Sequence, residues 1–444
     1  MTTGDDAVAL SDESQGLGSV IASQRVAQST GFGNYLFVQG AWFLAFGVQM
    51  VLFPYLVRVV LREDSIRFGL AQMSLQLPTT VLILFGGFVA DRVDTKRMLV
   101  IACSLTVLTF LILGGLVSAG RLTYGLLIGY ALTVGTISAF AMPARDSLLS
   151  HVAPEPGGIQ KAVAFASMAQ FGAQILGMIL ATMAPVLGVG PLLLGQSGLM
   201  ALAVLAALRL RPRPGHDKPP GEGNPLRFMA GQIGGGFAAV VASPVIAPVL
   251  VLSIGMGVCF MGAFAVLLPL IVQGYFPAHL EGAARTQIAS ALGVFALCFW
   301  TGSMLSATLL MRLGHVKRKG VVYLSALAAG ACVLMLCALP VPLWLLCAFN
   351  FAWGMGGGVA MTLSRGLVQE YAPPDKRARV LSIFTLGLMG GAPVGAVAYG
   401  FLAHAIGPRT AILIPSVGML TIVAAVAAFS KLKDLDEPSP TATA

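Results

Sequence analysis

Residues 86–97 of this 444-residue chain are GGFVADRVDTKR, a polar stretch between two long apolar runs. Gly87 and Asp91 are one helical turn apart and share a face of the predicted helix, where a glycine lets another helix approach closely. The Asp91 carboxylate at the helix end can accept hydrogen bonds from arginines or from the N-terminus of a neighbouring helix. The basic residues that follow, Arg92, Lys96 and Arg97, suit phosphate headgroups. The stretch therefore predicts a turn between two helices at a membrane surface.

The composition on either side of this turn is that of a chain whose main solvent is lipid. Of its residues, 57% are hydrophobic and 10% are charged, against about 25% charged in ordinary soluble domains. A helix needs about 20 apolar residues to cross a bilayer, and the sequence divides into twelve such runs. Their predicted ranges are 34–57, 68–90, 98–119, 122–144, 162–186, 189–208, 246–273, 286–310, 321–340, 342–364, 378–403 and 409–430. Since backbone polar groups in hydrocarbon must be bonded internally, we predict an all-α membrane protein with twelve transmembrane helices.

The Lys and Arg residues predict the orientation of these spans. With both termini cytoplasmic, all but six of the 27 basic residues fall on the cytoplasmic side, as the positive-inside rule requires. The six on the outer side are Arg58, Arg62, Arg67, Arg121, Arg285 and Arg409. Anionic lipid headgroups explain the net charge of +9, so nucleic acid is not an expected partner. We expect a protein integral to the cell (inner) membrane.

The chain divides into two similar halves around a central stretch rich in Pro, Gly and charge. Shifting the first half by about half the chain length lays Arg145 on Arg365 and Arg92 on Arg312. Many transporters are built from two such halves around a central site. The predicted units are a disordered cytoplasmic tail (1–33), a first six-helix half (34–208), a cytoplasmic linker with an amphipathic helix (209–242), a second six-helix half (243–430) and a second cytoplasmic tail (431–444).

The spacing Gly87-x-x-x-Asp91-Arg92-x-x-x-Lys96-Arg97 resembles the signature motif of the major facilitator superfamily, between its second and third helices. Residues 142–145 (MPAR), 373–382 (PPDKRARVLS) and 391–395 (GAPVG) are similar to one branch, the transmembrane secretion effector group that includes the enterobactin exporter and macrolide efflux proteins. The resemblance covers residues 35–425. It implies two pseudo-symmetric six-helix halves and a secondary transporter that exports its solute.

The resemblance also implies a gate on the cytoplasmic side. In the superfamily, the Asp that matches Asp91 contacts the N-terminus of helix 11 and an Arg at the end of helix 4, here Arg145. We therefore expect Asp91 and Arg145 within salt-bridge reach in the outward-facing state; a solvated loop charge is the alternative for Asp91. The expected gate residues are Gly87, Asp91, Arg92, Lys96, Arg97, Arg145, Arg377 and Arg379.

Two departures from the family pattern bear on mechanism. The second-half counterpart of Asp91 is Met311, so the expected gate is one-sided. Helix 5 has Gly172 and Gly177 but lacks the proline of the glycine-proline-glycine motif found in many antiporters. That difference argues against an antiport mechanism.

Polar side chains inside the predicted spans are few, and they are candidates for a neutral, hydrogen-bonding pathway wall. They are Gln39, Gln49, Gln72, Gln76, Gln170, Gln174 and Asn350. The two pairs spaced by four residues each form a polar stripe on one helical face. The alternative is that these amides join helices, at about 0.6–2 kcal/mol each, and the sequence leaves both interpretations open. For the tryptophans we favour packing or interface anchoring over a place in the pathway.

The acidic residues predict the class of solute. None of the 18 carboxylates lies near the centre of a predicted span, so a permanently cationic solute would find no buried counter-charge. We therefore expect a small neutral or zwitterionic amphiphile, moved by a monomeric secondary transporter whose other partners are membrane lipids. The alternatives are a facilitative uniporter or an importer of a small metabolite, and a membrane receptor that keeps the fold without transport.

Motifs for other functions are missing from the sequence. The five histidines lie in loops or near span ends, and neither an H-E-x-x-H helix nor a G-x-S-x-G elbow occurs, so an intramembrane enzyme is not expected. The lack of a G-x-x-x-x-G-K-[ST] loop argues against ATP as the energy source. The six cysteines lack metal-ligand spacing, so we expect neither a metal nor a cofactor.

Overall fold

The structure is a computed structural model that describes residues 31–90, 92–153, 159–211, 237, 240–277, 286–313, 318–373 and 376–434. In these ranges, twelve helices are long and apolar enough, by length and composition, to cross a membrane. The same ranges contain no β-strand. The predicted all-α class with twelve spans is confirmed. The two tails up to residue 30 and from 435, and most of the predicted amphipathic linker helix, lie outside the described residues.

The first half of the chain contains six spans. The first is α2 (Phe32–Tyr55), which continues into the π-helical segment η1 (Leu56–Val60). The fifth is α6 (Ile159–Thr182), followed by the short α7 (Ala184–Leu187). The others are α3 (Ser65–Ala90), α4 (Thr95–Ser118), α5 (Tyr124–Val152) and α8 (Val189–Leu208).

The second half contains the other six. Its first span is composite, because α10 (Ile246–Gly255) passes through two π-helical segments, η2 (Met256–Met261) and η3 (Ala263–Leu267), into α11 (Leu268–Gln273). The rest are α12 (Thr286–Leu313), α13 (Lys319–Leu336), α14 (Leu343–Tyr371), α15 (Arg377–Ile406) and α17 (Leu413–Phe429), with the short α16 (Pro408–Ala411) before α17 and η5 (Lys431–Asp434) after it.

Two helices run well past their predicted ends. Helix α5 continues to Val152 and α14 to Tyr371, several residues beyond the expected limits at 144 and 364. Hydropathy marks only the apolar segment of a helix, whereas helical hydrogen bonds continue past it. Arg145 and Arg365 therefore lie within helices and not in loops.

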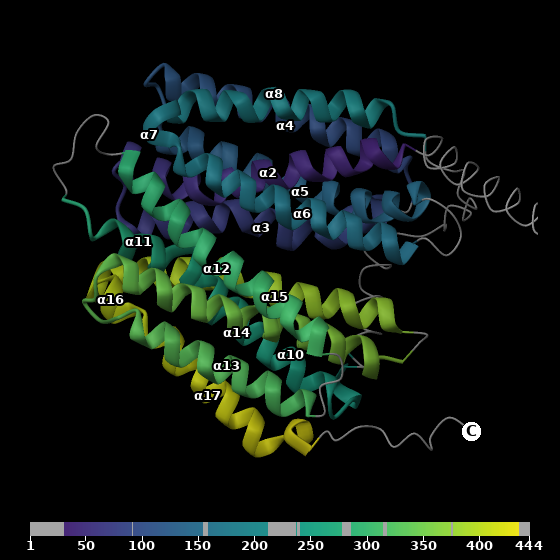
Figure 1. Cartoon of the computed structure of the whole chain (residues 1–444), viewed down its shortest axis with the longest axis vertical. Helices are drawn as coiled ribbons and strands as arrows, with labels where there is room; N and C mark the ends of the chain where they lie inside the picture. Colours follow the sequence, from purple (N-terminus) through teal and green to yellow (C-terminus); the bar gives the residue numbers. More distant parts are fainter. Residues whose placement is uncertain are drawn as a thin grey trace, which may run out of the picture.

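Figure 1 shows the two halves as two bundles lying side by side. We name the end of the molecule where α2 begins and α17 ends the tail end, and the opposite end, with α7, α11 and α16, the loop end. Helix α3 packs along α15, and α6 and α7 pack against α12, so these helices form the seam between the halves. In Figure 1, α12 begins beside α7 at the loop end and runs away from the first half toward the tail end.

At the loop end, α3 and α15 touch backbone to backbone. A Cβ added to Gly69 would lie 2.6 Å from the carbonyl oxygen of Ala396 and 3.0 Å from Cα of Gly400. A Cβ added to Gly400 would lie 2.8 Å from the carbonyl oxygen of Ser65. Only glycine fits at both positions, so the halves are closely packed at this end.

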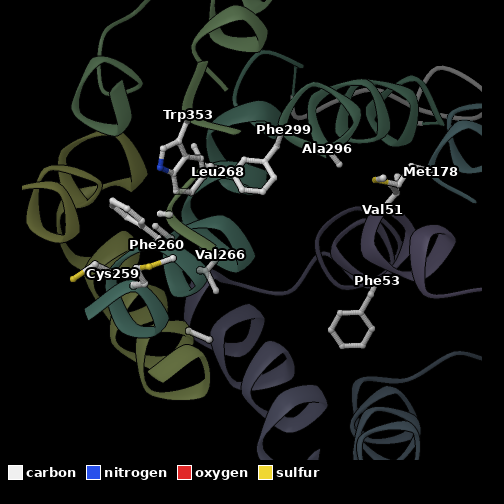
Figure 2. Close-up of a cluster of buried hydrophobic side chains, with 14 of the residues drawn as sticks. Val51, Phe53, Met178, Cys259, Phe260, Val266, Leu268, Ala296, Phe299 and Trp353 are labelled. Atoms are coloured by element: carbon white, nitrogen blue, oxygen red, sulfur yellow. The ribbon is translucent and has the colours of Figure 1, made fainter. Parts of the chain in front are cut away.

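The core of the second half is aromatic. Figure 2 shows Phe260, Phe299 and Trp353 grouped together, from the seventh, eighth and tenth spans. The ring centroids of Phe299 and Trp353 are 5.1 Å apart, and those of Phe260 and Trp353 are 5.5 Å apart in an edge-to-face arrangement. Such pairs prefer this geometry, which gives the second half a rigid centre beside the seam.

Candidate functional site

The turn that contains the signature motif is closed by a helix cap. The Asp94 carboxylate accepts hydrogen bonds from the backbone N–H groups of Lys96, at 2.9 Å, and Arg97, at 3.4 Å, and so begins α4. The guanidinium of Arg92 lies 3.5 Å from the ring centroid of Phe88. Asp91 lies outside the described residues, so its pairing with Arg145 stays a prediction.

The close helix approach expected at Gly87 is made by its neighbour. Among the described residues, no atom lies within 4 Å of a Cβ added to Gly87, whereas a Cβ on Gly86 would lie 2.1 Å from the carbonyl oxygen of Ala139 on α5. The expectation for Gly87 is wrong in this conformation, because adjacent residues point about 100° apart around a helix. Gly86 therefore packs α3 on α5, and Gly87 faces open space.

Arg145 is a buried cation enclosed by side chains of α2. Its side chain is 3% exposed, and its Nη1 donates a hydrogen bond to Oε1 of Gln39 at 3.3 Å. The guanidinium carbon lies 4.9 Å from the ring centroids of both Trp42 and Phe43. The hydroxyl of Tyr35 donates to the Arg145 carbonyl oxygen at 3.2 Å. Stacked aromatic faces and an amide oxygen thus stabilise this charge from three sides.

One N–H group of the Arg145 guanidinium has no hydrogen-bond partner in the described part of the chain. It is the Nε group, which is buried. A buried charged donor without a partner is costly, which makes Arg145 a candidate functional residue. Two further cations of the expected gate, Arg377 and Arg379, are exposed at the start of α15.

Two of the seven candidate pathway amides join helices within one half. Nε2 of Gln49 donates to Oε1 of Gln196 at 3.0 Å, and Nε2 of Gln196 donates to the Ala45 carbonyl oxygen at 2.9 Å, which ties α2 to α8. Nδ2 of Asn350 donates to the Phe295 carbonyl oxygen at 2.6 Å, which ties α14 to α12. The structure favours helix association for both.

The other amides take different places. Nε2 of Gln72 donates to the Ala265 carbonyl oxygen at 3.1 Å, across the seam. Gln174 is 2% exposed, and its Nε2 has no partner among the described residues. Gln76 and Gln170 are half-buried, one turn along the same helices. These two keep the exposure expected of a pathway wall, and Gln39 is instead the partner of Arg145.

Hydrogen bonds across the seam extend from the loop end to about the middle of α3. At the rim, Nε of Arg58 donates to Oε1 of Gln273 at 2.9 Å. Further bonds join Ser290 Oγ to the Thr182 carbonyl oxygen at 2.5 Å, Trp300 Nε1 to the Met50 sulfur at 3.2 Å, and Thr80 Oγ1 to the Met389 carbonyl oxygen at 3.4 Å. The loop end is therefore the closed end of the seam.

The tryptophans fall into separate roles. Trp353 is buried in the aromatic core, and Trp344 is exposed at the loop-end start of α14. Trp42 stacks on Arg145, and Trp300 is half-buried at the seam. Packing is thus confirmed for Trp353, whereas Trp300 bonds to the Met50 sulfur across the seam.

Several residues with clear structural roles have no signal in the sequence that would single them out. They are Tyr35, Arg58, Gly69, Gly86, Gln196, Gln273 and Gly400. The pairing of Arg58 with Gln273 joins the ends of the first and seventh spans, which the repeat makes equivalent helices of the two halves. From the sequence, this equivalence predicts that the two spans lie close together, but it does not predict which of their residues pair.

The comparisons with known proteins agree with this architecture. The family described as transmembrane secretion effector matches residues 48–443. The glucose facilitated diffusion protein of Zymomonas mobilis subsp. mobilis (strain ATCC 31821 / ZM4 / CP4) is 32% identical over 145 residues. That match covers 31% of this chain and 30% of the other protein, so the chain spans less than a third of that curated relative.

Solved structures with a similar fold have little sequence in common with the chain. The nucleoside transporter NupG has a TM-score of 0.70 at 16% identity, with 90% of this chain and 98% of that chain covered. A POT family transporter in complex with 5-aminolevulinic acid has a TM-score of 0.69 at 12% identity, with 90% and 96% covered. A bacterial homolog of the human lysosomal transporter Spinster has a TM-score of 0.65 at 14% identity, with 94% and 99% covered.

Proposed function

This chain belongs to the transmembrane secretion effector family and is a membrane transporter of the major facilitator type, and we propose that it exports a small neutral or zwitterionic amphiphile by alternating access. The two six-helix halves would move against each other around a solute site between them. The direction of transport rests on the family's description as secretion effectors.

The observation that supports alternating access is the one-ended seam. The halves are joined at the loop end by a limited set of hydrogen bonds and by the Gly69–Gly400 contact. Toward the tail end, no atom of the described ranges lies within 4 Å of the Cβ position of Gly87 on α3, and Arg377 and Arg379 on α15 are exposed. With both termini cytoplasmic, this is an inward-facing arrangement; the Spinster homolog of similar fold is described as inward-facing and unoccupied.

The proposed solute class rests on the charges along the seam. Among the described residues, no Asp or Glu lies in the middle of a span. Half-buried groups on the helices of the seam include Gln76, Gln170 and Trp300, which offer amide hydrogen bonds and an aromatic face. A solute with an apolar body and uncharged or internally balanced polar groups suits such a wall.

The test is flux through the purified protein in liposomes loaded with labelled candidate amphiphiles and an internal pH dye. We expect saturable flux of at least one neutral or zwitterionic candidate and none of permanently cationic analogues of the same size. Flux of no candidate would favour a receptor with this fold. A preference for the cationic analogues would contradict the solute class.

A second candidate function is facilitated diffusion without coupling. It is favoured by the lack of a carboxylate in the middle of the described spans, since proton-coupled carriers need a group that binds and releases a proton within the membrane. The glucose facilitated diffusion protein that the chain partly matches is named for this activity. Equilibration of the solute without accumulation under an imposed pH gradient would support this function over coupled export.

If coupling exists, it uses carboxylates at the helix ends. Asp146 lies near the end of α5 and Glu370 near the end of α14, and Asp91 is in the signature motif. Neutralising all three should abolish solute-induced proton flux. A proton flux that survives the triple change would show that the proton path lies elsewhere. We further propose a monomer in the cell (inner) membrane, with lipids as its standing partners.

A further inference from the structure

The rim of the seam at the loop end contains a reciprocal pair of side chains. Arg58, in η1 at the end of the first span, donates from Nε to Oε1 of Gln273 at 2.9 Å. Gln273, the last residue of α11, donates from Nε2 to the Arg58 carbonyl oxygen at 3.4 Å. Arg58 also donates from Nη1 to the carbonyl oxygen of Glu63. The first half therefore holds Arg58 in place, while Gln273 links it to the second half.

The neighbouring carboxylates are engaged elsewhere. Glu63 forms an ion pair with Arg67 at 2.8 Å, and the side chain of Asp64 accepts the Arg67 backbone N–H at 2.7 Å. All of these groups belong to the first half. The side-chain acceptor of Arg58 is therefore an uncharged amide from the opposite half, and parting the halves at this end must break that bond.

We propose that Arg58 and Gln273 form a latch that holds the loop end shut and must part before the loop end opens to the solute. This inference rests on the proposed alternating access. A hydrogen bond with one charged partner is stronger than a neutral one. It requires the desolvation of one charge where a buried ion pair requires that of two, and removing its neutral partner leaves a smaller penalty. Such a bond suits a contact that breaks and re-forms in every transport cycle.

The position of the pair makes it act as a latch and not only as a contact. Both residues lie at span ends, at the rim, whereas the Gln72–Ala265 bond lies further inside on α3. If the halves pivot about the inner contacts, the rim separates furthest. Loss of the rim bond should therefore shift the balance toward the open loop end without disturbing the packing of either half.

The experiment measures the distance between the halves at the loop end, without any solute. Spin labels are attached to Arg121→Cys in the first half and Leu339→Cys in the second, in a chain whose six native cysteines are replaced by serine or alanine; both labelled residues are exposed. With the latch intact, double electron–electron resonance should show a dominant short distance. Arg58→Met or Gln273→Leu should raise the ratio of the long to the short population by about tenfold or more.

Two further variants test the pair itself. Exchanging the partners, with Arg58→Gln and Gln273→Arg in one chain, should restore the short distance. The donor then lies at position 273 and the acceptor at position 58, so the bond across the seam can form again. Arg67→Met is the matched control, since it removes an arginine at the same end whose carboxylate partner lies in its own half. It should leave the distances unchanged.

The outcomes separate the latch from the proposed function. Unchanged distances in both Arg58→Met and Gln273→Leu, or an equal shift in Arg67→Met, would overturn the latch. If Arg58→Met fails to reach the membrane, Gln273→Leu decides, since it leaves the Arg58–Glu63 bond in place. In liposomes, latch variants should change kcat more than KM. Absence of flux in the unmodified protein would contradict the proposed function while the distance result stands.

Discussion

Gln39 and Arg145 meet across α2 and α5, with Oε1 of the amide 3.3 Å from Nη1 of the guanidinium. The residue expected to take part in a carboxylate gate is thus buried against an amide and two aromatic rings in this conformation. A pairing with Asp91, which we expect in the outward-facing state, would add a carboxylate to these neighbours. The gate that the family resemblance implies would therefore act on a charge that is buried in this conformation.

Arg145→Lys should lower the free energy of unfolding by about 1–2 kcal/mol. The ammonium group keeps the charge, but it cannot stack flat on Trp42 and Phe43 while also reaching Gln39. Thermal unfolding of the purified protein in detergent measures the effect. Arg365→Lys is the control, because this counterpart in the second half is exposed. An equal loss of stability in both variants would show that the aromatic and amide contacts of Arg145 are not the cause.

Asp91→Asn should reduce transport of the solute while protein still reaches the membrane. The amide cannot supply the charge that we expect to meet Arg145 and the start of α15 when the tail end closes. Initial rates in liposomes, normalised to reconstituted protein, provide the measurement. Transport kinetics identical to those of the unmodified chain would indicate that Asp91 is only a solvated loop charge.

Gly69→Ala should prevent the loop end from closing. Its new methyl group would lie 2.6 Å from a backbone oxygen, which cannot move away as a flexible side chain could. We expect transport to fall about tenfold or more, since overpacking costs about 1–3 kcal/mol. Gly129→Ala on α5 is the control, with no atom within 4 Å of the added Cβ. If Gly69→Ala transports normally, the tight contact is not required in the cycle.

Gln49→Leu should destabilise the first half by about 1–3 kcal/mol, because it leaves the Gln196 amide oxygen buried without its donor. Replacing both glutamines by leucine should recover part of that loss. Equilibrium unfolding in mixed micelles measures the free energy of unfolding of the unmodified protein, the single variant and the double variant. The KM for the solute should stay unchanged in the single variant. A raised KM with an unchanged free energy of unfolding would indicate that Gln49 contacts the solute in the pathway.

Labelling in intact cells checks the orientation. A membrane-impermeant thiol reagent should fail to modify Lys218→Cys and should modify Arg285→Cys, because the excess of basic residues places the first inside and the second outside. The reverse pattern would place the closed loop end on the cytoplasmic side, and the conformation described here would then be outward-facing.

Hydropathy was sufficient to predict the twelve spans, since the apolar length of a membrane helix is set by the bilayer. It could not predict the ends of α5 and α14, where helical bonding continues beyond the hydrocarbon. The periodicity of a single helix also leaves its rotation uncertain. That is why the sequence predicts a close helix approach at Gly87, whereas the structure has it at Gly86, against Ala139.

The candidate site was less predictable than the fold, for a different reason. The sequence shows which residues are polar, but not which helix each one faces. Gln49 and Gln72 both lie in early spans, yet one bonds within its half and the other across the seam. The Arg58–Gln273 pair joins residues far apart in the chain, and only the assembled halves bring them together.

The seam described above has a consequence for the response of the protein to salt. Its hydrogen bonds use amide, hydroxyl, indole and backbone groups, and Arg58 supplies their one formal charge. Mobile ions screen attraction between two charges and act weakly on a charge paired with a dipole. The strength of these contacts at the loop end should therefore stay nearly the same from dilute buffer to molar sodium chloride, so that any effect of ionic strength on the cycle acts through the charged tail end.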